Sequence, residues 1–128
     1  MKPERLTILV AEDDVLMLFI VAGMLRKNGY TVLEARDGAE ARAIMRERRN
    51  EIAAVLSDMH MPNIDGLKLA ELNFQDEALP FIAYTSTPNQ VVRRQLLTYD
   101  VRDYLVKPVE EALLVNTVRT AIKRCESL

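Results

Sequence analysis

The sequence predicts an α/β fold in which five parallel strands form one sheet with helices on both faces. Short, nearly all-apolar runs alternate along the chain with longer segments of helical composition. Apolar runs of this length are typical of strands that are buried on both faces. Strict alternation of such strands with helices is the pattern of a parallel sheet. The length of 128 residues suits a single domain that spans residues 1–128.

The elements follow one another in a regular order. We expect strands at about 6–11, 31–35, 52–57, 81–85 and 103–106. We expect helices at about 14–28, 39–49, 66–73, 87–98 and 110–124. Asp14 suits the cap of the first helix, and Gly29 suits its end. Right-handed crossovers leave few topologies for this order, and we expect the flavodoxin-like, doubly wound strand order 2-1-3-4-5.

Composition and charge argue against several classes of protein. The formal net charge is -2 and the isoelectric point is about 5.5, whereas nucleic-acid binding usually brings a basic stripe. The longest apolar run, Val15–Leu25, is much shorter than the roughly 20 residues that a spanning helix needs. A single cysteine, Cys125, and a start without an export signal indicate a reducing compartment. We therefore expect a cytoplasmic protein that binds neither nucleic acid nor membrane.

Polar side chains follow four of the predicted strands. Glu12 and Asp13 follow the first strand, Asp58 the third, Thr85 ends the fourth, and Lys107 follows the fifth. Ligands of doubly wound sheets bind at the carboxyl ends of the strands, so these side chains should converge there. An alternative for the acids is a helix start favoured by the helix dipole, which fits Asp14 better than its two predecessors.

The chemistry of this set points to phosphoryl transfer. Crowded carboxylates are unfavourable unless a cation neutralises them. Carboxylate oxygens with open water positions suit Mg²⁺, which favours one or two protein carboxylates together with phosphate oxygens. Lys107 adds a positive charge and Thr85 a hydroxyl donor. A carboxylate nucleophile beside a metal, a lysine and a hydroxyl is what phosphoryl transfer to aspartate requires.

Four segments together resemble the receiver domain of two-component response regulators. They are Ile8-Leu9-Val10-Ala11-Glu12-Asp13-Asp14, Leu56-Ser57-Asp58-Met59-His60-Met61-Pro62-Asn63-Ile64-Asp65-Gly66, Tyr84-Thr85-Ser86 and Asp103-Tyr104-Leu105-Val106-Lys107-Pro108. They occur in the family's order, and the resemblance covers essentially the whole chain. It implies a phosphoacceptor module that receives its phosphoryl group from a histidine kinase or a histidine phosphotransfer protein.

The resemblance also implies a role for each matching acceptor-site and metal-site residue. Asp58 would be the phosphoacceptor and a metal ligand. Asp13 would bind Mg²⁺ directly, and Glu12 mostly through a metal-bound water. The backbone carbonyl of His60 would be a further ligand.

Other matching residues would report phosphorylation to the rest of the domain. Thr85 would bond a phosphoryl oxygen, and Lys107 would contact the acceptor carboxylate or the phosphoryl group. Tyr104 would swing inward when Thr85 moves and so switch the face formed by the fourth helix, fifth strand and last helix. Without the resemblance, Tyr104 would be taken as a core residue. Pro108 would follow a cis peptide bond.

The first helix is apolar beyond what one core face needs. Helical spacing predicts a core-facing set of Met17, Ile20, Val21, Met24 and Leu25. It predicts an outward apolar set of Val15, Leu18, Phe19 and Ala22. Exposed apolar stripes usually mark partner sites, so we expect the histidine-bearing partner to dock here. Deeper burial and self-association into a homodimer are the alternatives.

Two other functions compete with a phosphoacceptor module, which would catalyse only its own phosphorylation and dephosphorylation. A Mg²⁺-dependent phosphatase with an Asp nucleophile generally has a second acid two residues after it, where this chain has His60. A receiver-like scaffold that ignores phosphate would not require the intact set of acids, threonine and lysine.

Overall fold

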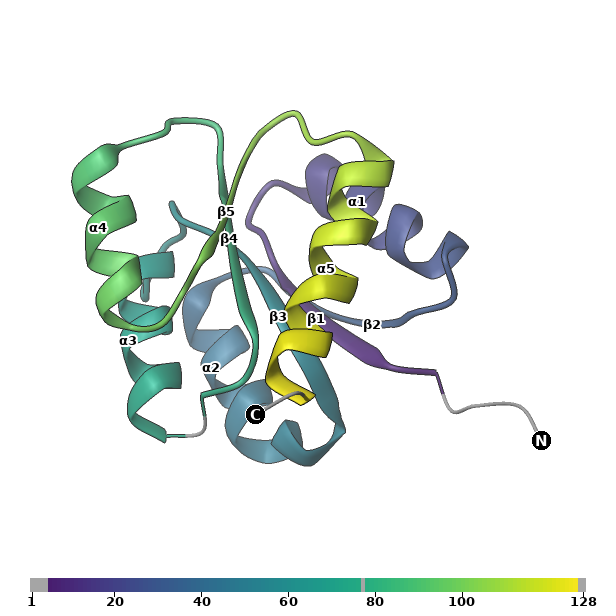
Figure 1. The fold of residues 1–128 in the computed structure, drawn as a ribbon, viewed down its shortest axis with the longest axis horizontal. Helices are drawn as coiled ribbons and strands as arrows, with labels where there is room; N and C mark the ends of the chain where they lie inside the picture. Colours follow the sequence, from purple (N-terminus) through teal and green to yellow (C-terminus); the bar gives the residue numbers. More distant parts are fainter. Residues whose placement is uncertain (1–4, 77, 127–128) are drawn as a thin grey trace.

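The computed structural model describes residues 5–76 and 78–126, and within them five parallel strands form one sheet (Figure 1). The strands are β1 (Thr7–Ala11), β2 (Thr31–Ala35), β3 (Ile52–Asp58), β4 (Phe81–Thr85) and β5 (Asp103–Val106). Their order is β2-β1-β3-β4-β5, and every pair is parallel. The predicted fold class and strand order are therefore confirmed.

Helices cover both faces of this sheet. They are α1 (Val15–Lys27), α2 (Gly38–Arg48) followed by the 3-10 turn η1 (Arg49–Glu51), α3 (Gly66–Asp76), α4 (Gln90–Thr98) and α5 (Glu111–Glu126). In Figure 1, α1 and α5 lie on one face, and α2, α3 and α4 lie on the other. No helix within the described ranges combines the length and the apolarity that crossing a bilayer requires.

The capping predictions explain where α1 begins and ends. Asp14 accepts hydrogen bonds from the backbone N–H groups of Leu16 and Met17, at 2.9 and 3.1 Å. Gly29 follows the helix with a φ of +94°, which side chains other than glycine rarely adopt. Because only Glu12 and Asp13 separate the cap from the end of β1, the cap fixes the point at which the chain leaves the sheet edge and keeps these two acids at that edge.

One predicted helix end was wrong. We expected α3 to end at about Asn73, yet it continues to Asp76. Asn73 is buried, and its side chain donates to the carbonyl of Leu79 and accepts from the Leu79 N–H, at 3.0 and 3.1 Å. The amide thus joins α3 to the approach of β4 instead of ending the helix.

Strand residues divide their side chains between two cores. The core under α1 and α5 contains Ile8, Val10, Leu56, Ile82 and Tyr84. The neighbours of these residues along the strands enter the opposite core. Burial of each large apolar side chain contributes about 1.5–3 kcal/mol to the stability of the fold. The stable sheet therefore holds the polar residues at its rim in fixed positions.

The predicted orientation of α1 is partly wrong. Leu18 and Ala22, expected to face outward, are buried against the sheet. Ile20, expected in the core, is 40% exposed, whereas Val15 and Phe19 are exposed as predicted. Nearly every position of this helix is apolar, so several stripes have the same hydrophobicity and periodicity cannot choose between them. In the structure, the stripe that contains Leu18 and Ala22 is the one that packs into the core.

Candidate functional site

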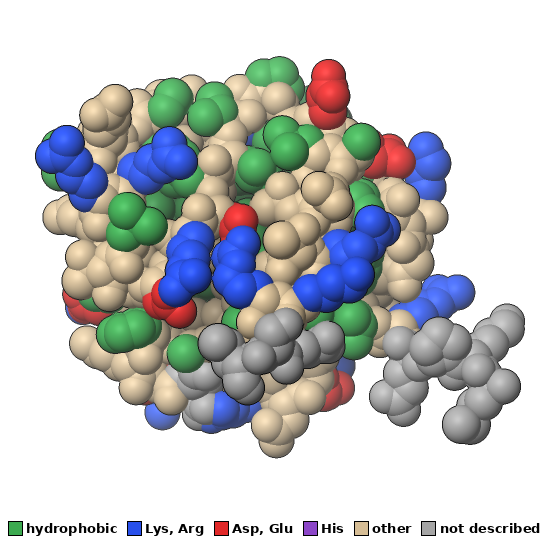
Figure 2. All heavy atoms as spheres, in the orientation of Figure 1, with side chains coloured by type: hydrophobic (Ala, Val, Ile, Leu, Met, Phe, Trp, Pro, Cys, Tyr) green, Lys and Arg blue, Asp and Glu red, His purple; other side chains and the backbone are tan. Residues whose placement is uncertain are grey.

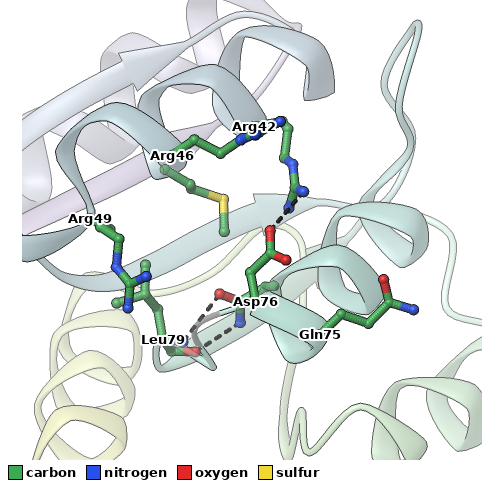
Figure 3. Close-up of a pocket in the computed structure, with 8 residues that line it drawn as sticks. Arg42, Arg46, Arg49, Gln75, Asp76 and Leu79 are labelled. Carbon is green, nitrogen blue, oxygen red and sulfur yellow. Dashed lines mark hydrogen bonds and ion pairs between the residues drawn. The ribbon is translucent and has the colours of Figure 1, made fainter.

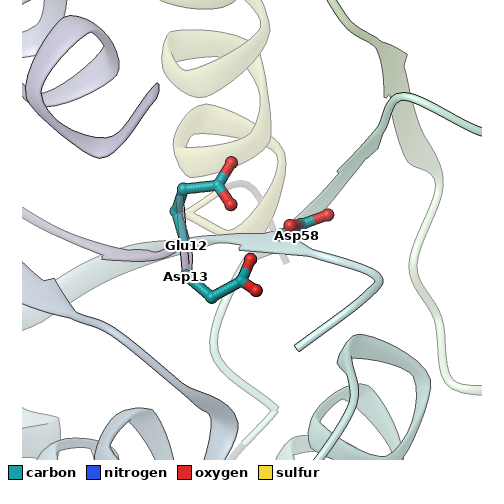
Figure 4. A group of neighbouring side chains, drawn as sticks. All are labelled: Glu12, Asp13 and Asp58. Carbon is teal, nitrogen blue, oxygen red and sulfur yellow. The ribbon is translucent and has the colours of Figure 1, made fainter. Parts of the chain in front are cut away.

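The acids predicted to converge do so at the carboxyl edge of the sheet. Glu12 and Asp13 directly follow β1, and Asp58 is the last residue of β3, the strand next to it. One carboxylate oxygen from each of the three lies within 4.8 Å of the others. Figure 4 shows the three side chains pointing toward a common space.

Burial makes the negative charges of this cluster unfavourable unless cations or hydrogen-bond donors lie close to them. Glu12 is fully buried and Asp58 is 5% exposed, whereas Asp13 is open to solvent. The ammonium group of Lys107 lies 2.5 Å from Glu12 Oε1 and 3.3 Å from Asp58 Oδ2. One lysine is therefore shared by two buried carboxylates. Its nearer partner is Glu12, which the sequence did not indicate.

The donor set fits a hard divalent cation. Three carboxylate groups within one small space supply oxygen ligands and excess negative charge. The exposed position of Asp13 leaves one side of the site open, so water or a phosphoryl oxygen can complete the coordination. This is the ligand chemistry that Mg²⁺ favours over all-protein cages.

Both oxygens of the Asp58 carboxylate have a defined partner. Oδ1 accepts a hydrogen bond of 3.3 Å from the backbone N–H of His60, and Oδ2 faces Lys107. Behind Asp58, Gly66 packs against the backbone of β3: a Cβ at this position would lie 2.3 Å from the carbonyl oxygen of Asp58. The loop after β3 is therefore held close to Asp58 by a glycine that no larger residue could replace without a shift.

Hydroxyl groups connect the end of β4 to the loop after β3. Thr85 is fully buried, and its Oγ1 accepts a 3.1 Å hydrogen bond from the N–H of Thr87. Thr87 Oγ1 also shares a 2.7 Å hydrogen bond with Nε2 of His60. We predicted Thr85 and His60 as site residues, but the sequence did not indicate Thr87. Its only signal was a hydroxyl two residues after the predicted donor.

Tyr104 lies at the edge of the same region, half-buried on β5. Its hydroxyl accepts a 3.1 Å hydrogen bond from the N–H of Asn89, the residue that caps α4. The guanidinium group of Arg93 lies 5.6 Å from the centre of its ring. Tyr104 therefore connects β5 with the start of α4. Its inward swing stays a prediction.

Sequence reasoning gave no role to Tyr84. This side chain is 1% exposed, and its hydroxyl donates a 2.9 Å hydrogen bond to Oε1 of Glu12. Its ring centre lies 4.4 Å from the ammonium group of Lys107. Burial, and next the charge of Glu12, raise the pKa of the Tyr84 phenol. A buried tyrosine usually finds a hydrogen-bond partner, so an aromatic hydroxyl in an apolar strand was the available signal.

A second pocket, of about 420 Å³, lies at the opposite edge of the sheet (Figure 3). It lies near the starts of β3 and β4 and is lined by Arg42, Met45, Arg46, Arg49, Asn73, Gln75, Asp76 and Leu79. Arg42 forms a 2.7 Å ion pair with Asp76 across it. This ion pair joins α2 to α3.

The chain can now be compared with known proteins. Residues 8–119 match the family model described as the response regulator receiver domain. The chain is 32% identical over 122 residues to the two-component response regulator ARR2 of Arabidopsis thaliana, covering 95% of this chain and 18% of that protein. It is 36% identical over 107 residues to ORR25 of Oryza sativa subsp. japonica, covering 84% and 15%. The chain thus spans less than a fifth of each of these relatives.

Solved structures agree with the sequence comparison. A response regulator receiver domain protein from Clostridium thermocellum superposes with a TM-score of 0.87 at 27% identity, over 94% of this chain and 97% of that one. The signal receiver domain of an HD domain-containing protein from Pseudomonas fluorescens Pf-5 gives 0.90 at 25% identity, over 98% and 100%. With the matched residues, the fold and the acidic cluster in agreement, this chain belongs to the response regulator receiver domain family.

Proposed function

We propose that this receiver domain takes a phosphoryl group from a phosphohistidine onto Asp58, with Mg²⁺ bound beside it. The observation that carries the proposal is the meeting of Glu12, Asp13 and Asp58 within 4.8 Å, with Lys107 between two of them. Carboxylates held this close, two of them buried, call for a cation and leave one acid free to act as nucleophile.

The chemical step follows from the two oxygens of Asp58. One carboxylate oxygen forms a bond to phosphorus as the bond from phosphorus to the donor's imidazole nitrogen breaks, and the imidazole leaves with that electron pair. Mg²⁺, when bound, supplies charge neutralisation for the transferring group. Lys107, 3.3 Å from Oδ2, is placed to pair with a phosphoryl oxygen. The domain thereby catalyses only its own phosphorylation and dephosphorylation.

The signal would leave the site through Thr85 and Tyr104. Thr85 Oγ1 now accepts from Thr87 and would turn its own hydrogen toward a phosphoryl oxygen. That turn draws the loop before α4 inward, and Tyr104 would release the Asn89 N–H and follow. The face formed by α4, β5 and α5 would change shape as a result.

The partner surface is proposed on α1, with its residues corrected by the structure. The exposed apolar residues are Val15, Leu16, Phe19 and Ile20, and Phe19 is 77% exposed. In Figure 2, apolar side chains are scattered over the upper part of the visible face, and Figure 1 shows α1 lying behind the start of α5 in this orientation. We expect a histidine kinase or histidine phosphotransfer protein to dock here, in the cytoplasm. A Phe19→Glu variant that is phosphorylated by its donor at normal speed would exclude this docking, and a wild type that is already monomeric would exclude a homodimer.

Intact mass after incubation with acetyl phosphate and Mg²⁺ tests the proposed reaction. Wild type should gain one phosphoryl group, and Asp58→Asn should gain none. Repeated turnover of phosphate esters would instead indicate the phosphatase. A wild-type chain that stays unmodified with a competent donor present would favour the scaffold.

A further inference from the structure

Glu12 has an unusually complete set of donors for a side chain that is fully buried. Its Oε1 accepts from the hydroxyl of Tyr84 at 2.9 Å and from the ammonium group of Lys107 at 2.5 Å. Its Oε2 accepts from the backbone N–H of Asp14 at 3.2 Å. Tyr84 in β4 and Lys107, the residue after β5, thus both donate to a single oxygen of Glu12, the acid expected to reach the metal through water.

We propose that Tyr84 is a positioning residue of the metal site: its hydroxyl holds Glu12 in place in the unphosphorylated domain, and also when Lys107 turns to the phosphoryl group on Asp58. The inference rests on the proposed function and adds a residue to it. Tyr84 touches neither the acceptor nor the transferring group in this arrangement, so it acts through Glu12.

Such a residue is needed because Lys107 pairs with two acids, Glu12 and Asp58. Its ammonium group is closer to Glu12 than to Asp58, at 2.5 against 3.3 Å. If Lys107 pairs with a phosphoryl oxygen on Asp58, Glu12 loses its nearest cation while it remains out of water. A buried carboxylate without hydrogen-bond donors is strongly unfavourable. The Tyr84 hydroxyl keeps one side-chain donor on Oε1 throughout.

The geometry of Tyr84 suits this task in two further ways. Tyr84 pairs directly with Asp58 in the register of β3 and β4, so its backbone is fixed relative to the acceptor. Its ring centre lies 4.4 Å from the Lys107 ammonium group, a distance at which a cation and an aromatic ring attract each other.

The test is the Mg²⁺ affinity of Tyr84→Phe, measured by calorimetry on the unphosphorylated protein. Loss of a hydrogen-bond partner of a metal-site residue typically weakens metal affinity by about 10–100-fold, and we expect a weakening of about ten-fold. The matched control is Tyr99→Phe, which removes a 2.8 Å hydrogen bond from a tyrosine to Glu71 away from the site. The control should bind Mg²⁺ as wild type does.

Two further measurements separate positioning from a structural effect. The chain has no tryptophan, so its near-ultraviolet spectrum reports its tyrosines, and Mg²⁺ should produce a difference spectrum in wild type that Tyr84→Phe lacks. In a Glu12→Gln background, Tyr84→Phe should change the affinity by less than about two-fold, because the coupling between the two residues is already lost. An equal loss in both backgrounds would overturn the proposal.

The outcomes also distinguish this inference from the proposed function. If wild type binds no Mg²⁺, both fall. If wild type binds Mg²⁺ and is phosphorylated, but Tyr84→Phe binds as tightly as wild type, only the role of Tyr84 is refuted.

Discussion

Replacing Lys107 with methionine should destabilise the domain strongly in the absence of divalent cations. The side chain of Lys107 is 10% exposed, and it pairs with two acids that are themselves buried. Removing one partner of a buried ion pair costs about 3–5 kcal/mol, because the remaining charge is left unpaired. Tyr84 and the Asp14 N–H still donate to Glu12, so we expect the lower end, about 3 kcal/mol.

Urea unfolding with and without Mg²⁺, at constant ionic strength, measures this effect. With a denaturant slope of about 1–3 kcal/mol per molar, the midpoint should fall by roughly 1–3 M. Mg²⁺ should then stabilise the variant more than wild type, because the ammonium group no longer competes for the same carboxylates. At a concentration of about 100 times the dissociation constant, bound Mg²⁺ would restore about 2.7 kcal/mol.

The matched control is Lys68→Met. Lys68 forms a 2.6 Å ion pair with Glu71 on the surface of α3, with a side chain that is 56% exposed. Exposed pairs of this kind contribute little, so its midpoint should stay close to that of wild type. A Lys107→Met midpoint equal to wild type, or a larger Mg²⁺ effect on wild type than on the variant, would refute the reasoning about the shared lysine.

Three other substitutions probe the surroundings of the site. Gly66→Ala would place a Cβ 2.3 Å from the carbonyl oxygen of Asp58, so a destabilisation of about 1–3 kcal/mol in urea and slower labelling are expected; a neutral effect would contradict the close packing. Because the pKa of Tyr84 is raised in the folded state, the unfolded chain releases that proton first, and wild-type stability should fall as pH rises above about 10. The slope from this group is at most about 1.4 kcal/mol per pH unit, and urea titrations of Tyr84→Phe should lack it. His60→Ala removes the 2.7 Å contact with the loop before α4 and should shorten the lifetime of the acyl phosphate, and an unchanged decay rate would show that the ring has no such role.

The strands could be predicted because burial on both faces leaves a clear mark in the sequence. The central strands β1, β3 and β4 are mostly apolar and largely buried, and polar residues stand at their carboxyl ends, such as Glu12 after β1 and Asp58 at the end of β3. The parallel order then brings these rim residues to one edge. The convergence of Glu12, Asp13 and Asp58 could therefore be predicted from the sequence.

The orientation of α1 and the role of Tyr84 could not be predicted for different reasons. In α1 almost all side chains are apolar, so the choice between Leu18 and Ile20 as a core residue depends on how the helix lies on the sheet. The contact between Tyr84 and Glu12 joins β4 to the end of β1, with β3 between them. Pairings across a strand leave no periodic pattern in the sequence.

The most direct test of the account is to identify the residue that carries the phosphoryl group and to ask whether Mg²⁺ is required. Acyl phosphates formed with acetyl phosphate can be trapped by borohydride reduction and located by peptide mass spectrometry. We expect a label on the peptide that contains Asp58 when Mg²⁺ is present, and its loss when the metal is removed with EDTA. A label on another residue, or equal labelling without Mg²⁺, would contradict the claim that the acidic cluster and a divalent cation together make Asp58 the acceptor.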